Sequence, residues 1–283
     1  MTDPEGLLLV DKPGGMTSHD VVDVVRRTLR TRKVGHAGTL DPMATGLLVL
    51  GVGRATRLLR FLGDLPKTYE GSARLGVETT TLDADGDTTA ERPVSSTEDD
   101  VRSAMTALIG ESLQSPPAYS AVKVGGRKLY EAARKGEALE AAPRPIRVDG
   151  FELTSFRAPD IDFLVTCSGG TYVRVLLADV GDALGCGAHL TRLRRTAIGS
   201  LDVHDAVVLD RIVAPLPIDR AVAHLPRLDL DAEEAIAAGH GRVLGPAGIT
   251  GPYAVFRSDA TLIGVYEDVG PQARPLVILA ARG

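Results

Sequence analysis

A histidine and an aspartate five residues apart, His36 and Asp41, are the residues whose types and spacing first suggest chemistry. They lie in residues 34–46, a stretch that also contains three glycines and Pro42. Because proline disfavours helical geometry in the residue before it, Asp41 is expected on an irregular loop. The apolar run at residues 47–50 follows directly and predicts a buried strand. A carboxylate on a loop that a core strand anchors is an arrangement typical of catalytic groups.

An aspartate before a proline more often stabilises a turn than it catalyses a reaction, so the stretch alone does not decide the matter. Four further blocks do, at residues 11–18, 67–70, 168–174 and 193–196. Together with the Gly-His-x-Gly-x-Leu-Asp-Pro-x-Ala-x-Gly stretch, they resemble in sequence and order the TruB family of tRNA pseudouridine-55 synthases. The resemblance extends from about residue 7 to about residue 200.

The resemblance implies a fold and a division of the chain. It predicts an α+β pseudouridine synthase fold, with a mixed, largely antiparallel central sheet and flanking helices and loops. Residues 1–226 would form the catalytic domain, with a mobile, basic RNA-binding insertion at about 114–145. Residues 227–283 would form a small, mostly-β PUA-like domain, and a composition shift near Pro226 favours that boundary.

The activity that the resemblance implies is the isomerisation of uridine 55 in the T-arm of tRNA to pseudouridine. The bond from uracil N1 to the ribose breaks, the base rotates, and it rejoins through C5. Such a rearrangement has no redox step and no group donor, so neither a cofactor nor a metal is expected. The stacked target base must first be flipped out of the helix. The expected partner is the T-arm stem-loop of tRNA, bound by a monomer without an obligate protein partner.

The family's motifs also imply roles for individual residues. Asp41 matches the catalytic aspartate, and Arg174 its salt-bridge partner, which would offset the cost of desolvating the carboxylate. Tyr69 would stack on the uracil and could help remove the C5 proton, while Tyr172 would pack the pocket. Leu193 would form an apolar wall of the same pocket. Whether Asp41 attacks the sugar, attacks C6 of the base or abstracts a ribose proton stays open.

Three more residues are expected to touch the tRNA. His36 would fill the space that the flipped nucleotide leaves, and it lacks the second ligand at helical spacing that a zinc site requires. Arg57 lies in a matching Ala-Thr-Arg segment, and Lys123 lies in the basic insertion. Lys12, by contrast, is expected mainly to build a strand, tight turn and capped helix.

The net charge of −5 argues against a nucleic-acid partner, but the charge is segregated along the chain. Residues 1–74 and 116–157 each carry +3, and both contain matching motifs. Residues 75–115 carry −7 and residues 201–283 carry −4. This segregation is typical of a protein that binds one phosphate backbone on one face.

Other features exclude some classes of protein. No apolar run of about eighteen residues exists, so we expect no membrane span. The acidic N-terminus has no apolar signal region, and we expect a cytoplasmic protein. Cys167 and Cys186 are expected to be small buried side chains. The acidic run Asp83–Asp87 departs from a calcium loop in its glycine position and predicts a β-turn.

Hydrophobic periodicity and capping signals predict the remaining elements. Helices are expected at 17–29, 96–109, 171–184 and 231–238, with two short helices before about 224. A further helix is expected after Arg57, ending at about residue 62. Strands are expected at 6–10, 47–52, 67–77, 146–156, 161–167, 189–199, 253–256, 262–267 and 276–280.

Three other functions are compatible with parts of this pattern. A guide-RNA-directed uridine isomerase shares the His-x-Gly-x-Leu-Asp-Pro core, but such relatives usually carry partner-binding extensions. A tRNA-folding chaperone would use the basic insertion and tail, yet it gives no reason for Asp41 to pair with Arg174. Glycoside hydrolysis requires two carboxylates, and the motifs offer one candidate. For the tail, RNA binding and structural stabilisation both stay open.

Overall fold

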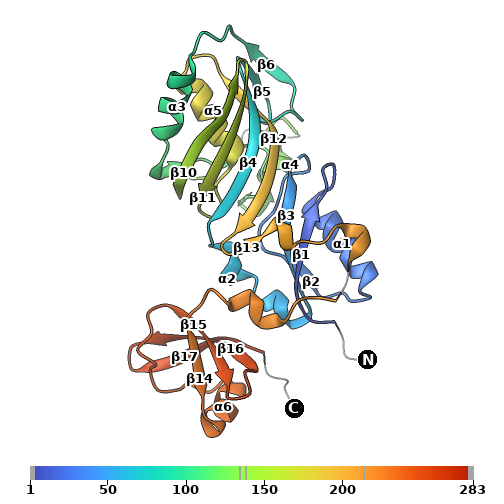
Figure 1. Ribbon diagram of the computed structural model, residues 1–283, viewed down its shortest axis with the longest axis vertical. Coiled ribbons are helices and arrows are strands. Elements are labelled where there is room, and N and C mark those ends of the chain that lie inside the picture. Colours follow the sequence, from blue (N-terminus) through green and yellow to red (C-terminus); the bar gives the residue numbers. More distant parts are fainter. Residues whose placement is uncertain (1–3, 134, 138, 213, 280–283) are drawn as a thin grey trace.

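A nine-stranded sheet forms the larger part of the molecule (Figure 1). The structure is a computed structural model and describes residues 4–279 except 134, 138 and 213. The strands run in the order β1-β3-β12-β4-β11-β10-β7, with β2 paired to β3 and β13 paired to β12. Their bounds are β1 Gly6–Lys12, β2 Val34–His36, β3 Thr45–Val52, β4 Lys67–Leu75, β7 Gly110–Gln114, β10 Arg144–Arg157, β11 Asp160–Cys167, β12 Ala188–Ile198 and β13 Leu201–Asp202.

The predicted mixed, largely antiparallel sheet is confirmed. Among the described strands of this sheet, β12 and β3 pair in parallel, and the other neighbours pair antiparallel. The parallel contact is short and joins Arg194 to Thr45 and Arg195 to Gly46. It brings the strand that follows the Asp41 loop against the strand that carries Leu193.

Strand β3 is buried on both faces, which explains its unbroken apolar run. Successive side chains of a strand point to opposite faces. Leu47 and Val49 pack in one hydrophobic cluster with Leu7 and the C-terminal Phe256. The alternate residues of β3, Leu48 and Leu50, pack in a second cluster beneath α1.

Helices cover the two halves of the sheet separately. The helix α1 packs beside β1 and β2, and its predicted capping box between Thr17 and Asp20 is present. In the other half, α3 and α5 lie together on one face of the sheet, against β10 and β12 (Figure 1). The α-helices are α1 Ser18–Thr28, α2 Arg60–Gly63, α3 Glu98–Thr106, α4 Leu129–Ala133, α5 Val173–Ala183 and α6 Ala232–Gly239.

Some predicted elements are wrong in detail. The strand expected through residue 77 ends at Leu75, and Gly76, with a positive φ of 82°, separates it from the next strand. A hairpin of β5 Val77–Thr79 and β6 Thr88–Glu91 follows. The helix expected after Arg57, to about residue 62, is the short α2, and a 3₁₀ turn precedes it. Instead of two short helices before residue 224, 3₁₀ turns carry the chain; the 3₁₀ segments are η1 Gly53–Arg57, η2 Val203–Asp205, η3 Leu209–Arg211 and η4 Ile218–Val222.

A second sheet of four strands and α6 forms the C-terminal part, as expected for a small, mostly-β unit. Its strands are β14 Arg227–Leu230, β15 Pro252–Arg257, β16 Leu262–Val269 and β17 Gln272–Ile278. The strand expected at 276–280 is the end of β17, and residue 280 lies outside the described residues. Ala254 and Phe256 of this sheet share a hydrophobic cluster with Leu7 and Leu47 of the large sheet. A hydrophobic cluster therefore joins the two parts of the chain.

The basic insertion between β7 and β10 contains regular structure. A small hairpin, β8 Lys123–Val124 and β9 Arg127–Lys128, turns at two glycines and leads into α4. Both expected buried cysteines are buried. None of the helices within the described residues is long and apolar enough to cross a membrane.

Candidate active site around Asp41

Asp41 lies in the loop between β2 and β3, and contacts from the β1–α1 turn hold both of its neighbours. Ser18 Oγ accepts a hydrogen bond from Leu40 N at 2.9 Å and donates one to Leu40 O at 3.2 Å. On the other side, Lys12 Nζ donates to Pro42 O at 3.2 Å. These hydrogen bonds therefore hold the main chain in place on both sides of Asp41.

The structural role predicted for Lys12 is confirmed. Its ammonium is buried and also donates to the carbonyls of Pro13 at 2.9 Å and Met16 at 2.6 Å. Burial lowers the pKa of Lys12 to about 8, although Asp41 opposes the shift. Lys12 thus closes the turn that supports the Asp41 loop.

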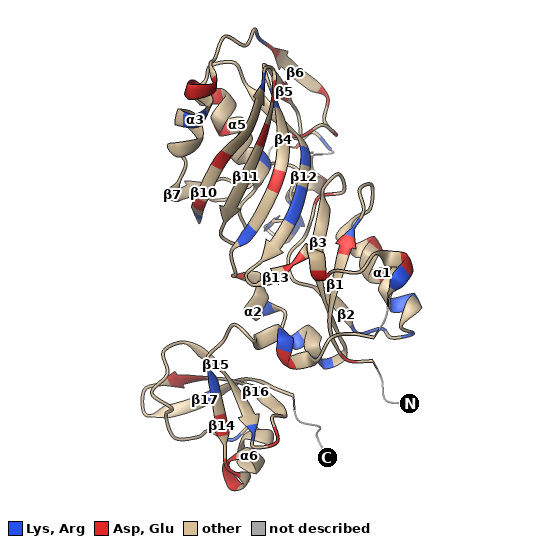
Figure 2. Cartoon of the chain, viewed as in Figure 1, with Lys and Arg blue, Asp and Glu red and all other residues tan. Residues whose placement is uncertain are grey.

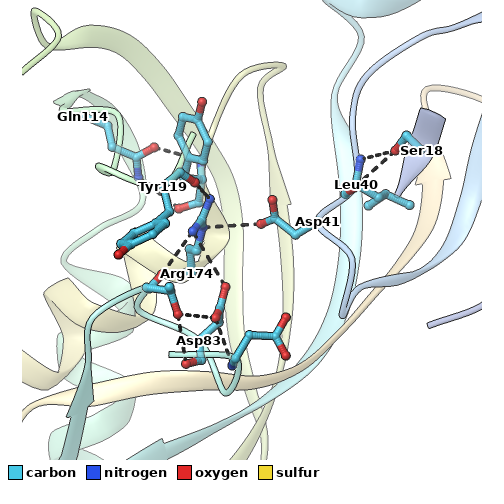
Figure 3. Close-up of polar contacts among 10 residues, drawn as sticks. Ser18, Leu40, Asp41, Asp83, Gln114, Tyr119 and Arg174 are labelled. Carbon is cyan, nitrogen blue, oxygen red and sulfur yellow. Dashed lines mark hydrogen bonds and ion pairs between the residues drawn. The ribbon is translucent and has the colours of Figure 1, made fainter. Parts of the chain in front are cut away.

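The predicted ion pair between Asp41 and Arg174 is present (Figure 3). Arg174 Nε lies 3.4 Å from Asp41 Oδ2, and the Arg174 side chain is only 4% exposed. The same guanidinium reaches a second carboxylate, because Arg174 Nη1 lies 3.7 Å from Oδ2 of the buried Asp83. Nη1 also donates to Thr81 O at 3.1 Å, and Nη2 donates to Tyr119 O at 2.6 Å. Four segments far apart in the sequence therefore meet at this one side chain.

Burial raises the pKa of Asp41 above its usual range. The positive charge of Arg174 opposes this rise, whereas Asp83 and Asp85 add to it. Arg174 therefore offsets the desolvation of Asp41 only in part, because burial has the larger effect and the two nearby carboxylates add to it. Asp41 is thus a carboxylate that protonates more readily than an exposed aspartate.

Tyr69 and Leu193 pack beside the loop that carries Asp41. Tyr69 on β4 and Leu193 on β12 are buried in one hydrophobic cluster with Leu40 and Ala44, which flank Asp41 in the sequence. Burial raises the pKa of Tyr69, so its hydroxyl stays protonated at neutral pH and can donate a hydrogen bond. The predicted apolar wall and aromatic side chain therefore lie in the core next to the loop.

Tyr172 is half-buried at the start of α5, where it is the residue before the first helical position. Its ring centroid lies 5.7 Å from Arg174 Cζ, within the range of a cation–π contact. Tyr172 therefore lies against the guanidinium that pairs with Asp41.

His36 ends β2 and presents an unused polar atom. Its Nδ1 is buried without a hydrogen-bond partner, and its ring meets His19 edge-on at a centroid distance of 6.5 Å. Burial lowers the pKa of His36, and the charges of His19 and Arg195 lower it further. The neutral imidazole therefore predominates at neutral pH, with one unpaired nitrogen buried at the end of β2.

The two remaining predicted tRNA contacts lie away from Asp41. Arg57, on η1, donates from Nη1 to Ile278 O of the C-terminal sheet. This contact gives Arg57 a structural partner within the chain. Lys123 is exposed on β8 in the insertion. Their roles in tRNA binding stay predictions.

Residues 26–173 match the family model of the TruB family pseudouridylate synthase N-terminal domain. The chain belongs to this family. Residues 174–224 match the tRNA pseudouridylate synthase B C-terminal domain, and residues 225–280 match the tRNA pseudouridine synthase II C-terminal model. The chain is therefore a pseudouridine synthase, as the motifs indicated.

Relatives match the TruB chain over nearly its full length. It is 46% identical over 284 residues to tRNA pseudouridine synthase B of Mycobacterium sp. (strain KMS), covering 97% of this chain and 95% of the relative. It is 47% identical over 289 residues to the protein of the same name from Mycolicibacterium paratuberculosis (strain ATCC BAA-968 / K-10), covering 98% of each.

Solved structures share the fold. An H/ACA RNP bound to a substrate RNA containing 2'-deoxyuridine matches with a TM-score of 0.75 and 25% identity, over 98% of this chain and 86% of that one. A Cbf5-Nop10-Gar1 complex matches with a TM-score of 0.73 and 27% identity, over 97% and 84%. The pseudouridine synthase fold is thus confirmed.

Sequence reasoning missed two charged residues of the TruB site. Asp83 forms the predicted turn, with its Oδ1 accepting from Asp85 N at 3.1 Å, but it is also buried beside Arg174. No local signal distinguishes it from an exposed turn aspartate. Arg195 is 1% exposed and donates to Leu47 O at 2.7 Å and Gly38 O at 3.2 Å. The sequence did contain a signal for Arg195. Residues two apart on a strand lie on the same face, and Arg195 is two residues after Leu193 on the predicted strand.

Arginines concentrate on β12, as the blue segments of that strand show in Figure 2. Arg194 pairs with Asp11 at 2.7 Å, and Arg192 lies 3.7 Å from Glu70. Arg195 turns inward toward the Asp41 loop. Three arginines thus lie on the strand next to the candidate active site, and two of them are paired with carboxylates.

Proposed function

We propose that this TruB-family enzyme isomerises uridine 55 in the T-arm of tRNA to pseudouridine, without a guide RNA or a cofactor. Asp41 is the proposed catalytic carboxylate. The observation that carries the proposal is the contact of Asp41 with the buried Arg174 on a loop held from both sides. A reaction at one base needs a carboxylate whose position is set before the substrate arrives.

The surrounding residues support a flipped uridine as the substrate. An extruded base needs apolar and aromatic contacts to replace its lost stacking. Tyr69 and Leu193, which pack with the residues flanking Asp41, supply such groups. His36, at the end of β2, would fill the space that the flipped nucleotide leaves. The exposed Lys123 would contact the phosphate backbone.

A comparison of sequence identities favours tRNA as a direct substrate over a guide-RNA complex. The relatives named tRNA pseudouridine synthase B are 46–47% identical to this chain, whereas the H/ACA RNP component is 25% identical. We accordingly propose a monomer that acts in the cytoplasm on free tRNA, with a catalytic domain at 1–226 and a smaller domain at 227–283.

The test is to incubate the purified protein with a tRNA transcript in the presence of EDTA and to map pseudouridine. Carbodiimide modification with primer extension locates the product, and mass spectrometry of nuclease fragments quantifies it. We expect modification at position 55 alone. Asp41→Asn should reduce product below detection while tRNA affinity stays within about twofold, because phosphate contacts that carry affinity lie elsewhere.

The matched control is Asp87→Asn, which removes an exposed carboxylate from the turn next to the site. This variant should remain fully active. Turnover by Asp41→Asn would exclude the proposed role of that carboxylate. Modification that appears only when a guide RNA is added would favour the guide-directed alternative.

A further inference from the structure

Gln114 ends the edge strand β7 and is buried, at 6% exposure, although the three residues before it are exposed. Both polar ends of its side chain bond to the main chain of Tyr172. Oε1 accepts from Tyr172 N at 2.8 Å, and Nε2 donates to Tyr172 O at 3.2 Å (Figure 3). The amide therefore holds one peptide unit on each side of Tyr172.

Tyr172 is where α5 begins. No side chain of its own caps the helix, and its carbonyl accepts the first helical bonds, from Val175 N at 3.1 Å and Leu176 N at 3.3 Å. The N–H groups at a helix start have no acceptor within the helix, and Gln114 Oε1 supplies one for Tyr172 N from outside it. Arg174 lies two residues further on, so the position of the helix start determines where the Arg174 side chain leaves the backbone.

A second contact comes from the same segment. Five residues after Gln114, Tyr119 O accepts the hydrogen bond from Arg174 Nη2 at 2.6 Å. Pro116 and Pro117 lie between the two contacts, and proline restricts the backbone to a narrow range of φ. Residues 114–119, here called the brace, thus bond to Tyr172, two residues before Arg174, at one end and to the Arg174 guanidinium at the other.

The brace leads into the basic hairpin. Ser120 O accepts a bond from Tyr130 N at 3.1 Å, which closes the hairpin and α4 onto the end of the brace. The hairpin carries the exposed Lys123 and Arg127. A displacement of this hairpin would therefore be transmitted to Arg174 through a short segment whose backbone two prolines restrict.

We infer that Gln114 is a positioning residue, through which the brace orients Arg174 on Asp41 and couples the placement of the basic insertion to the geometry of catalysis. Because this rests on the proposed function, its test includes a measurement without RNA. The expected effect is on rate, since Gln114 is buried and does not itself offer a surface to tRNA.

The test compares Gln114→Met with the wild type under single-turnover conditions at saturating tRNA. Methionine has nearly the same length but forms neither amide bond. We expect the rate constant to fall by roughly 10- to 100-fold, the loss expected when a catalytic group is misplaced by about 1 Å. The tRNA dissociation constant should stay within about twofold. A wild-type rate, or a loss confined to affinity, would overturn the inference.

Two control variants separate positioning from general effects. Leu113→Ala changes an exposed side chain on the same strand, and Gln272→Met makes the same substitution in the C-terminal sheet. Both should keep the wild-type rate. Should Gln114→Met fail to fold, Gln114→Glu takes its place, because it keeps the acceptor for Tyr172 N and loses the donor. We expect its rate to fall about tenfold at unchanged affinity, and a wild-type rate would again contradict the inference.

The RNA-free measurement follows the carboxyl ¹³C signal of Asp41 against pH, assigned by its absence from Asp41→Asn. If the brace holds Arg174 in place, Gln114→Met should raise the pKa of Asp41 further, since the opposing charge moves away. If the pKa of Asp41 rises in Gln114→Met but the wild-type protein does not modify tRNA, the proposed function is rejected and the brace is not. If the wild-type protein modifies tRNA and Gln114→Met changes neither the rate nor the pKa of Asp41, the brace is rejected and the proposed function is not.

Discussion

Arginines lie both at the Asp41 site and at the joint, the region where η1 and α2 meet the end of β17. The two groups differ in burial and therefore in how strongly their charges act on neighbouring groups. Arg174 is 4% exposed and meets two carboxylates, whereas Arg54 at the joint is 48% exposed. Arg54, Arg57 and Arg60 donate to the carbonyls of Leu279, Ile278 and Leu276. A buried charge acts strongly on its neighbours, and an exposed one is screened by water.

This contrast separates chemistry from attachment. At the site, moving one cation changes the protonation and placement of a catalytic carboxylate. At the joint, the arginines add to a hydrophobic cluster that already contains Leu7, Leu47, Ala254 and Phe256. Substitutions at the site should therefore change rates, and those at the joint should change stability.

After Asp41→Asn, the largest effect is expected from Tyr69→Phe, which keeps the ring in the core and removes its hydroxyl. If the hydroxyl helps to move the C5 proton, the single-turnover rate should fall by roughly 10²–10⁴-fold, as for other acid–base groups. Affinity for tRNA should change little, because stacking is retained. Equal rates for the two proteins would leave Tyr69 as a stacking platform only.

A somewhat smaller loss is expected from Arg174→Lys, roughly 10²–10³-fold in rate, as when one electrostatic donor of an active site is removed. Lysine keeps the charge but cannot reach Asp41, Asp83 and two carbonyls with one planar group. Arg192→Lys is the matched control on an exposed arginine of β12 and should remain active. Full activity of Arg174→Lys would show that charge alone suffices.

The pH dependence tests the second carboxylate. Asp41 should act as the ionised form, so activity should be lost as pH falls through its raised pKa. Asp83 adds to that rise, and removing its charge in Asp83→Asn should move the acid limb of the rate profile to lower pH. Asp85→Asn should move it in the same direction by less. A limb that moves upward in either variant would contradict this electrostatic account.

The smallest effect on rate is expected at the joint. Arg57→Ala removes one hydrogen bond to β17 and should lower the free energy of unfolding by about 1 kcal/mol, with the single-turnover rate unchanged. Thermal unfolding measures the first and pseudouridine mapping the second. A loss of tRNA affinity without a loss of stability would instead support the substrate contact predicted from the sequence.

Local patterns were sufficient to predict much of this protein. The Asp41 loop, the buried strand after it, the capped α1 and the helix start at Arg174 each depend on residues close together in the chain. The pair between Asp41 and Arg174 was predicted because both lie in motifs of one family. Cap, turn and strand signals act over a few residues, and so they can be read from the sequence.

Only the tertiary structure decided the rest. Whether Asp83 is an exposed turn residue or a buried second carboxylate depends on α5 packing against its turn. Gln114 has a role because β7 ends beside Tyr172, 58 residues later in the chain. Arg57 points to β17, more than 200 residues away. Burial and electrostatic environment arise from contacts between distant segments, and no short pattern around a residue contains them.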